Sequence, residues 1–182
     1  LAGASFAGEP IDVGSRLELF IDDYLIDQIT GDAEQRLHKP TPQEGALVTD
    51  KPWEGNTCAY YTVFRDGELC RMYYRGSHYD TETRRMSHRQ VACYAESADG
   101  VHWTKPELGL FEFDGSTANN IILSPDAVAE VKGDPAHTAV FLDANPDCPP
   151  EAKYKIIMLG RPHGLYVMGS PDGINFSLLS DK

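Results

Sequence analysis

Short apolar stretches alternate with glycine and proline along the chain. The stretches are rich in β-branched and aromatic residues: LELFIDDYLID, CAYYTVF, LCRMYYRG, VACYAES, KYKIIMLG and GLYVMGS. Apolar runs of this length, bounded by turn-forming residues, are typical of β-strands. One segment carries helix-start signals, with Ser124 as N-cap and Pro125 at the first helical position, and it predicts a short connector of about two turns. The pattern therefore predicts an all-β protein.

An internal repeat organises these stretches. The first copy reads TVFRDGELCRMYYRG from Thr62 and CYAESADGVHW from Cys93; the second reads AVFLDANPDCPPEAKYKIIMLG from Ala139 and LYVMGSPDGINF from Leu165. A spacing of 73 positions separates Ser97 from Ser170, Asp99 from Asp172, Gly100 from Gly173 and Trp103 from Phe176, whereas Phe64 and Phe141 are 77 apart. Each copy predicts one four-stranded antiparallel meander, at about 57–113 and 137–180. Repeats of this size stack on one another, because a single sheet cannot bury both of its faces.

The repeated S-x-D-G-x-x-aromatic element is predicted to be architectural. Asp followed by Gly supplies a side-chain cap and a residue that tolerates positive φ, which is what a tight hairpin needs. The aromatic residue that follows can fold back onto the sheet.

Charge narrows the range of partners. The chain has 182 residues, 16 Lys+Arg against 28 Asp+Glu, and a formal net charge of −12. Phosphate-rich partners need clustered Lys and Arg, so neither nucleic acid nor an anionic membrane is expected to bind.

No apolar run approaches the roughly 20 residues of a membrane span. The basic segment 83–89 is predicted to be a solvated loop, with a sulfated or uronic-acid sugar as the alternative ligand.

The N-terminus and the cysteines indicate whether the protein is exported from the cell. Residues 1–10 are expected to be a signal-peptide remnant or a disordered N-terminus, since Ser5-Phe6-Ala7 fits the small-x-small pattern of a cleavage site. This favours a secreted or periplasmic protein.

The four cysteines lack metal-ligand spacing, so no zinc site is expected. Cys70 and Cys93 are predicted either to form a disulfide or to be buried free thiols.

The repeated hairpins, together with RLELFIDDYLID and PWEGNTCAYYTVFRDG, resemble the five-bladed β-propeller glycoside hydrolases of families 32 and 43. The closest likeness is to an uncharacterised secreted bacterial branch of that group. The resemblance implies an all-β, five-bladed type of β-propeller built from four-stranded antiparallel blades. Residues 11–182 would supply about two blades and a leading strand at about 17–27, as the N-terminal part of a longer enzyme.

The resemblance also implies a catalytic position. In these enzymes the base or nucleophile is an Asp on the first inner strand, which corresponds here to Asp22 or Asp23. Strand alternation would place the two on opposite faces, so that one of them points inward. Paired carboxyl groups are what glycoside hydrolysis needs. The alternative is a strand-end turn with two solvated acids.

Four further residues are candidates for substrate binding, because they precede predicted inner strands. They are Trp53, Glu54 and Asn56 before the first meander and His137 before the second, with Asp134 nearby. The alternative for each is an ordinary polar loop residue. No cofactor is expected, and no acidic cluster has calcium-loop spacing, so no metal is expected either.

The sequence thus predicts a secreted glycoside hydrolase, or the N-terminal part of one, that cleaves a polysaccharide by paired-carboxylate catalysis. The alternative is a non-catalytic propeller that binds carbohydrate or protein, since propellers support many functions. A third interpretation is a structural piece without activity of its own. Self-association through open blade edges is also expected.

Overall fold

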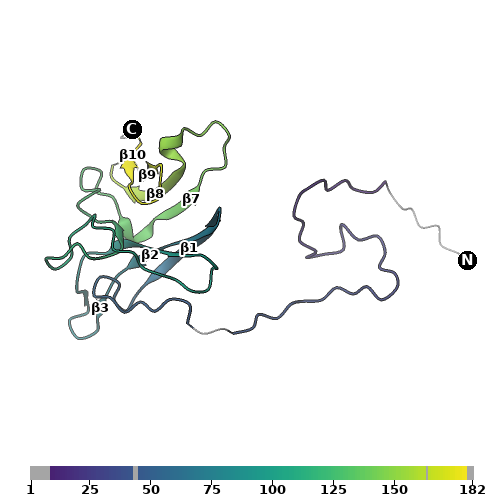
Figure 1. The fold of residues 1–182 in the computed structure, drawn as a ribbon, viewed down its shortest axis with the longest axis horizontal. Coiled ribbons are helices and arrows are strands. Elements are labelled where there is room, and N and C mark those ends of the chain that lie inside the picture. Colours follow the sequence, from purple (N-terminus) through teal and green to yellow (C-terminus); the bar gives the residue numbers. More distant parts are fainter. Residues whose placement is uncertain (1–8, 43–44, 163, 180–182) are drawn as a thin grey trace, which may run out of the picture. The chain divides into compact units, whose positions relative to one another are not determined.

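A computed structural model describes residues 9–42, 45–162 and 164–179. The chain divides into two compact units, residues 1–42 and 43–182 (Figure 1). The proposed cleavage site at Ser5-Phe6-Ala7 lies outside the described residues. In the part of the chain that is described, no helix is long and apolar enough to cross a membrane.

The first unit contains turns but no strand or helix between residues 9 and 42. The expected strand at 17–27 is absent, which corrects the prediction. Its apolar side chains are exposed, including Leu17 at 101% and Ile21 at 83%. A strand forms only where a neighbour accepts its backbone hydrogen bonds, and residues 9–42 offer no paired segment.

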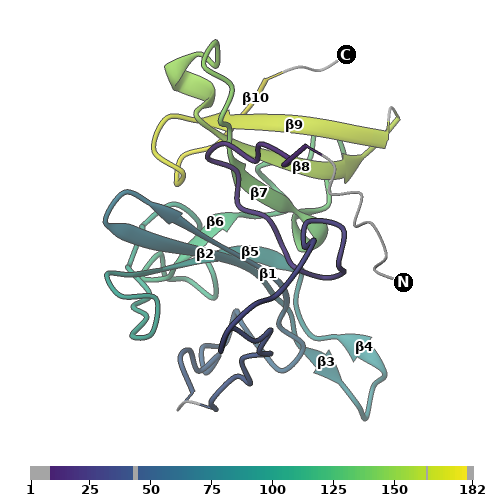
Figure 2. The same ribbon diagram turned by 90° about the vertical axis from the view of Figure 1, so that its right-hand side faces the viewer.

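The second unit begins with a four-stranded antiparallel sheet, the first sheet. Its strands are β1 (Ala59–Asp66), β2 (Leu69–Gly76), β5 (Val91–Ser97) and β6 (Ile121–Leu123), side by side in that order. A separate hairpin of β3 (Tyr79–Asp80) and β4 (Arg85–Met86) is inserted between β2 and β5. Figure 2 shows this hairpin projecting away from the two larger sheets.

A second four-stranded antiparallel sheet, the second sheet, follows. It consists of β7 (Ala139–Leu142), β8 (Tyr154–Gly160), β9 (Gly164–Ser170) and β10 (Ser177–Leu178), again in chain order. Two short 3-10 helices flank β7, namely η1 (Pro135–His137) and η2 (Pro150–Ala152). The prediction of an all-β protein with antiparallel four-stranded sheets is confirmed.

The strand register is the same in the two sheets over residues 62–66, 69–76 and 91–97 of the first and their counterparts in the second. It pairs Cys70 with Ser97 and Phe64 with Arg71 in the first sheet, and Tyr154 with Ser170 and Phe141 with Lys155 in the second. Phe64 and Phe141 therefore occupy the same position, as their 77-residue spacing predicts.

The fourth strand of the first sheet differs from the prediction. Trp103 does not open a continuous strand; the next residue, Thr104, forms only an isolated bridge to Glu96. The chain then leaves the sheet and returns as β6, which pairs with Ala92 and Cys93 near the other end of β5. The first meander therefore extends to residue 123, beyond the expected boundary at 113. The segment 124–130 forms consecutive turns instead of the predicted short helix.

The two S-x-D-G turns have the same geometry, as expected. Ser97 Oγ accepts the N–H of Gly100 at 2.8 Å, and Ser170 Oγ accepts that of Gly173 at 2.9 Å. The next two backbone N–H groups donate to the Asp99 carboxylate in one turn and to that of Asp172 in the other, each at 2.8 Å. Both glycines have positive φ, at +78° and +77°, which only glycine adopts without strain.

The strands β2, β5 and β6 of the first sheet are largely buried on both faces. Along β5, Ala92 and Tyr94 pack with residues of the second sheet, whereas Cys93 and Ala95 pack on the opposite side. That opposite side is covered by aromatic side chains from the flanking loops: Trp53, Trp103, Phe111 and Phe113. The unbroken burial of β5 explains why its sequence lacks the polar alternation of a one-sided strand.

The second sheet has one buried and one open face. Tyr154, Ile156 and Met158 of β8 are buried in the core shared with the first sheet or beside it. The other face is apolar and largely exposed; its members are Phe141, Ile157, Leu159, Leu165, Val167 and Leu179, and we call it the open face.

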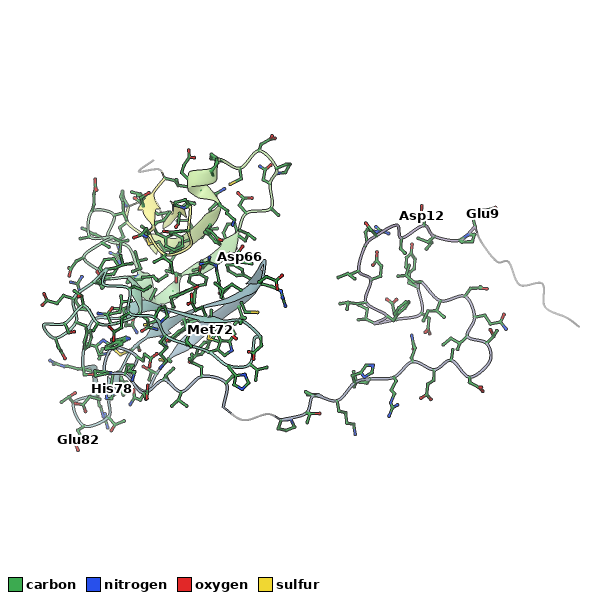
Figure 3. The ribbon with its side chains drawn as sticks, viewed as in Figure 1. Glu9, Asp12, Asp66, Met72, His78 and Glu82 are labelled. Carbon is green, nitrogen blue, oxygen red and sulfur yellow. The ribbon has the colours of Figure 1, made fainter. Side chains whose placement is uncertain are left out.

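Polar contacts join the two sheets at the second S-x-D-G turn. Arg71 Nη1 donates to the Asp172 carbonyl at 2.9 Å, and Tyr73 Oη donates to the Gly173 carbonyl at 2.9 Å. Arg71 Nε also donates to Asp66, the last residue of β1, at 2.8 Å. Figure 3 labels Asp66. In the second sheet the equivalent residues, Asp143 and Lys155, form the equivalent ion pair.

All four cysteines are free thiols. Cys70 lies opposite Ser97 and Cys93 lies opposite Tyr74, so the two are not cross-strand neighbours. The disulfide alternative is therefore not formed in the structure. Burial raises the pKa of the Cys93 thiol well above its ordinary value, which keeps it neutral.

Candidate functional site

The predicted catalytic residues lie in the first unit. Asp22 and Asp23 are both exposed, in a turn rather than a strand. Asp22 Oδ1 accepts the backbone N–H of Tyr24 at 3.0 Å. Because no strand forms here, the expected division of the pair between two faces of a sheet does not arise.

Glu54 lies in the interior of the second unit with 0% exposure. Its Oε2 accepts Lys105 Nζ at 2.7 Å and the backbone N–H of Lys51 at 3.0 Å. Its Oε1 accepts Tyr74 Oη at 2.5 Å. These donors satisfy the carboxylate, and its burial leaves no surface of Glu54 for a ligand.

Trp53 belongs to the same buried network. Its Nε1 donates to Asn120 Oδ1 at 2.6 Å, and Asn120 Nδ2 donates to Tyr74 Oη at 2.8 Å. Its ring packs edge-on against Phe113, with 6.1 Å between centroids. The structure therefore uses Trp53 to cover the first sheet rather than to present an aromatic face.

Asn56 is exposed and pairs with the backbone of Tyr79. Its Nδ2 donates to the Tyr79 carbonyl at 3.1 Å, and its Oδ1 accepts the Tyr79 N–H at 2.9 Å. Asn56 thus ties the start of β3 to the segment before β1. Trp53, Glu54 and Asn56 have architectural contacts in the structure.

A bulge in β1 places two tyrosines at the surface. The register between β1 and β2 shifts between Ala59 and Thr62, and Tyr60 has φ +57°. Side chains other than glycine rarely adopt this conformation, and it costs about 1 kcal/mol or more. Bulges re-aim side chains, often beside functional sites. Tyr60 and Tyr61 are 54% and 49% exposed.

Each tyrosine of the bulge has a supporting partner. The ring of Tyr61 stacks on Tyr74, with centroids 5.4 Å apart and planes inclined by 17°. Burial, with smaller effects of Cys58 and Glu54, raises the pKa of Tyr61 to about 12, so its hydroxyl stays protonated at neutral pH. The guanidinium of Arg75 lies 4.8 Å from the centroid of the Tyr60 ring.

His137, at the end of η1 just before the second sheet, contacts Tyr60. The centroids of its ring and that of Tyr60 are 4.8 Å apart, in an edge-on arrangement. Asp134 Oδ1 caps η1 by accepting the N–H of Ala136, and its Oδ2 contacts His137 Nδ1 at 2.7 Å. The carboxylate thus fixes the orientation of the imidazole and leaves Nε2 without a hydrogen-bond partner among the described residues.

The two residues that meet come from the start of the first strand of each sheet. Tyr60 is the second residue of β1 and lies inside the bulge, and His137 lies two residues before β7. The bulge adds a residue to β1, so the 77-residue equivalence that joins Phe64 to Phe141 does not extend to Tyr60. We call Tyr60, Tyr61, Arg75, Asp134 and His137 the bulge cluster.

No protein-family model, curated protein or solved structure matches the chain. The assignment of a function thus depends on the geometry of this chain alone. The described residues contain no group of three or more His, Cys, Asp or Glu side chains that could hold a metal ion.

The basic segment 83–89 comprises the end of the β3–β4 turn, β4 and the residues that follow it. Arg84 and Arg85 are exposed, and Arg89 pairs with Asp126 at 2.5 Å. An open pocket of about 570 Å³ lies here; its lining includes His88, Arg89, Gln90 and Asp134. Asp134 therefore borders both this pocket and His137.

The bulge cluster combines exposed aromatic faces, a guanidinium and an oriented imidazole. Such a set can stack on a flat or pyranose ring and form hydrogen bonds to its polar groups. Of the cluster, sequence reasoning named His137 and Asp134 but missed Tyr60, Tyr61 and Arg75. The adjacent tyrosines were a signal, because two neighbouring large side chains fit a regular one-sided strand poorly.

Proposed function

We propose that this protein binds carbohydrate at the bulge cluster. The observation that supports the proposal is the pair of exposed tyrosines on a strained bulge, with Tyr60 in contact with His137 of η1. A strained backbone persists only where its surroundings maintain it, and such positions concentrate at binding and catalytic sites.

We also propose that the two sheets are consecutive blades of a β-propeller. The repeat supports this: Tyr94, which faces the second sheet, is equivalent to Val167 on the open face. The sheets therefore stack head to tail, with the same face of each pointing the same way along the stack. The first strands, β1 and β7, contact each other, as inner strands do around a common axis.

The test is a binding titration of the full chain with a panel of plant and algal oligosaccharides. Tyr60→Gly keeps the positive φ and removes the ring, and Tyr61→Ala removes the second ring. Each is expected to weaken binding about tenfold, since loss of an aromatic stacking face costs of order 1 kcal/mol. Phe141→Ala, a partly exposed aromatic on the open face, is the matched control and should bind like the wild type. Equal affinity of all four proteins would contradict the proposal.

Glycoside hydrolysis is the second candidate. It is favoured by Asp23, whose exposed carboxylate has no hydrogen-bond partner among the described residues, beside Asp22. In this proposal the protein is a secreted enzyme in which one of the two acts as base or nucleophile.

The assay is release of reducing ends from the sugars that bind. Asp22→Asn or Asp23→Asn should reduce turnover by orders of magnitude with unchanged sugar affinity, because the ionised carboxylate is removed at constant shape. Wild-type turnover in both variants would leave binding as the function.

A further inference from the structure

We infer that the bulge cluster selects an anionic sugar, with Arg75 as the residue that recognises the acidic group. The inference rests on the proposed carbohydrate binding and adds the substrate class. It commits to a pyranose that carries a carboxylate or a sulfate group.

Arg75 is a half-buried cation without a counter-ion. Its Nη2 donates to the Thr57 carbonyl at 2.8 Å, and it forms no ion pair with any described residue. Its Nε is buried and has no hydrogen-bond partner in the described part of the chain. The other half-buried arginine of the same strand, Arg71, pairs with Asp66 at 2.8 Å. In a chain of net charge −12, a desolvated guanidinium left unpaired is unusual, because burying an uncompensated charge is costly.

The surroundings of Arg75 favour an anion over a cation or a neutral group. The guanidinium lies over the Tyr60 ring, 4.8 Å from its centroid, so its free donors are held beside an aromatic ring that is itself partly exposed. The nearby carboxylate of the cluster, Asp134, is already engaged by Ala136 N–H and His137 Nδ1. A planar guanidinium matches a carboxylate or sulfate with two parallel hydrogen bonds.

His137 adds a second polar contact. Its Nδ1 is held by Asp134, so Nε2 is the atom available to a ligand, and both the imidazole and the Arg75 guanidinium contact the Tyr60 ring. A sugar ring bound beside Tyr60 would present its acidic group to Arg75 and a hydroxyl to His137. The sugar class is thus defined by one acidic substituent on a ring that contacts the bulge cluster.

The experiment titrates the full chain with three oligosaccharides of equal length: an oligogalacturonate, a neutral galactan and a sulfated galactan. An acidic sugar should bind at least about tenfold tighter than the neutral one, as expected for a charge-assisted hydrogen-bonded pair. Arg75→Gln should remove that preference, and Arg75→Lys should restore only part of it. The control Arg65→Gln removes an exposed arginine of β1 and should leave the preference unchanged. The carboxylated and sulfated arms identify which acidic group is preferred.

A second measurement does not depend on how well the variants fold. The side-chain Nε–H signal of Arg75 in the wild-type protein, assigned through Arg75→Lys, should shift on addition of the acidic sugar and remain in place with the neutral one. Equal affinity for acidic and neutral sugars, with an unmoved Arg75 signal, would overturn the inference and leave carbohydrate binding standing. Absence of binding to every sugar of the wider panel would overturn both.

Discussion

Glu54 retains a fully buried carboxylate because each of its oxygens has a donor, from Lys51, Tyr74 and Lys105. Lys105 is 51 residues away along the chain, so the sequence places Glu54 only in a polar segment before a strand. The partner that gives it a structural role becomes visible only once the loop after β5 has folded back. Arg75 is the opposite case, a charged side chain without an ionic partner. In the sequence it is an ordinary strand residue, and only the fold shows that it lacks a counter-ion.

Lys105→Met should destabilise the protein by about 3–5 kcal/mol, because it leaves the Glu54 carboxylate buried without a cation. Urea denaturation measures the change. Lys51→Met is the control, since that side chain is 47% exposed and its ion pair with Asp50 is at the surface; its effect should stay within about 0.5 kcal/mol. Adding Glu54→Gln to Lys105→Met should recover part of the loss. Similar effects of Lys105→Met and Lys51→Met would contradict the structural role.

Asp172 should make stability depend on acid pH. Partial burial works to raise its pKa, but hydrogen bonds from Asn175, Ile174 and Ser170 outweigh burial and lower it to about 2. A folded-state pKa below the unfolded value gives a stabilisation that is complete above about pH 4 and is lost as the pH falls toward 2. Since Asp172 is exposed, the contribution is about 1 kcal/mol after solvent screening. The difference in unfolding free energy between wild type and Asp172→Asn should shrink over this range; a constant difference would refute the assignment.

At the scale of elements, the S-x-D-G turns were the part of the structure that the sequence predicted best. Its hydrogen bonds are local, so the residues that form each turn lie within a few positions of each other. The strand at 121–123 was not predicted, because three apolar residues after Asn119 and Asn120 are too few to show the periodic pattern that indicates a strand. The stretch at 17–27 has that periodicity, and yet it forms no strand without a neighbour.

The contact between sheets depends on Arg71, which links β1, β2 and the second S-x-D-G turn. Burial opposes the ionised form of Asp66, but hydrogen bonds from Tyr154 and Arg71 lower its pKa, so the carboxylate is charged and needs its cation. Arg71→Ala should therefore cost about 3 kcal/mol, because the Asp66 carboxylate is left partly buried and without its main partner.

The matched control is Arg65→Ala, whose side chain is 62% exposed and pairs with an exposed Glu68. Its effect on the free energy of unfolding should be below about 0.5 kcal/mol. Comparable losses in the two variants would show that Arg71 does not hold the sheets together.

At the scale of the molecule, the open face is an exposed apolar surface on the second sheet. Leu159 and Leu165 are cross-strand partners, 52% and 65% exposed. Contiguous apolar patches of this kind promote association. We expect the protein to bind a hydrophobic dye and to self-associate as its concentration rises.

Leu159→Lys combined with Leu165→Glu should reduce both dye fluorescence and the sedimentation coefficient at high concentration. Stability should change by no more than about 0.5 kcal/mol, because both side chains are already in water. Val101→Lys, an exposed position in the first S-x-D-G turn, is the control. Unchanged association in the double variant would place the contact elsewhere.

The bulge also sets a limit on what the two copies of the repeat share. From Thr62 onward the register of the first sheet recurs in the second, whereas Tyr60 belongs to the stretch where the first copy has one residue more. The contact between Tyr60 and His137 is therefore a point at which the two copies are unlike. Exchanging the two side chains, with Tyr60→His and His137→Tyr together, tests whether binding depends on which copy carries which ring.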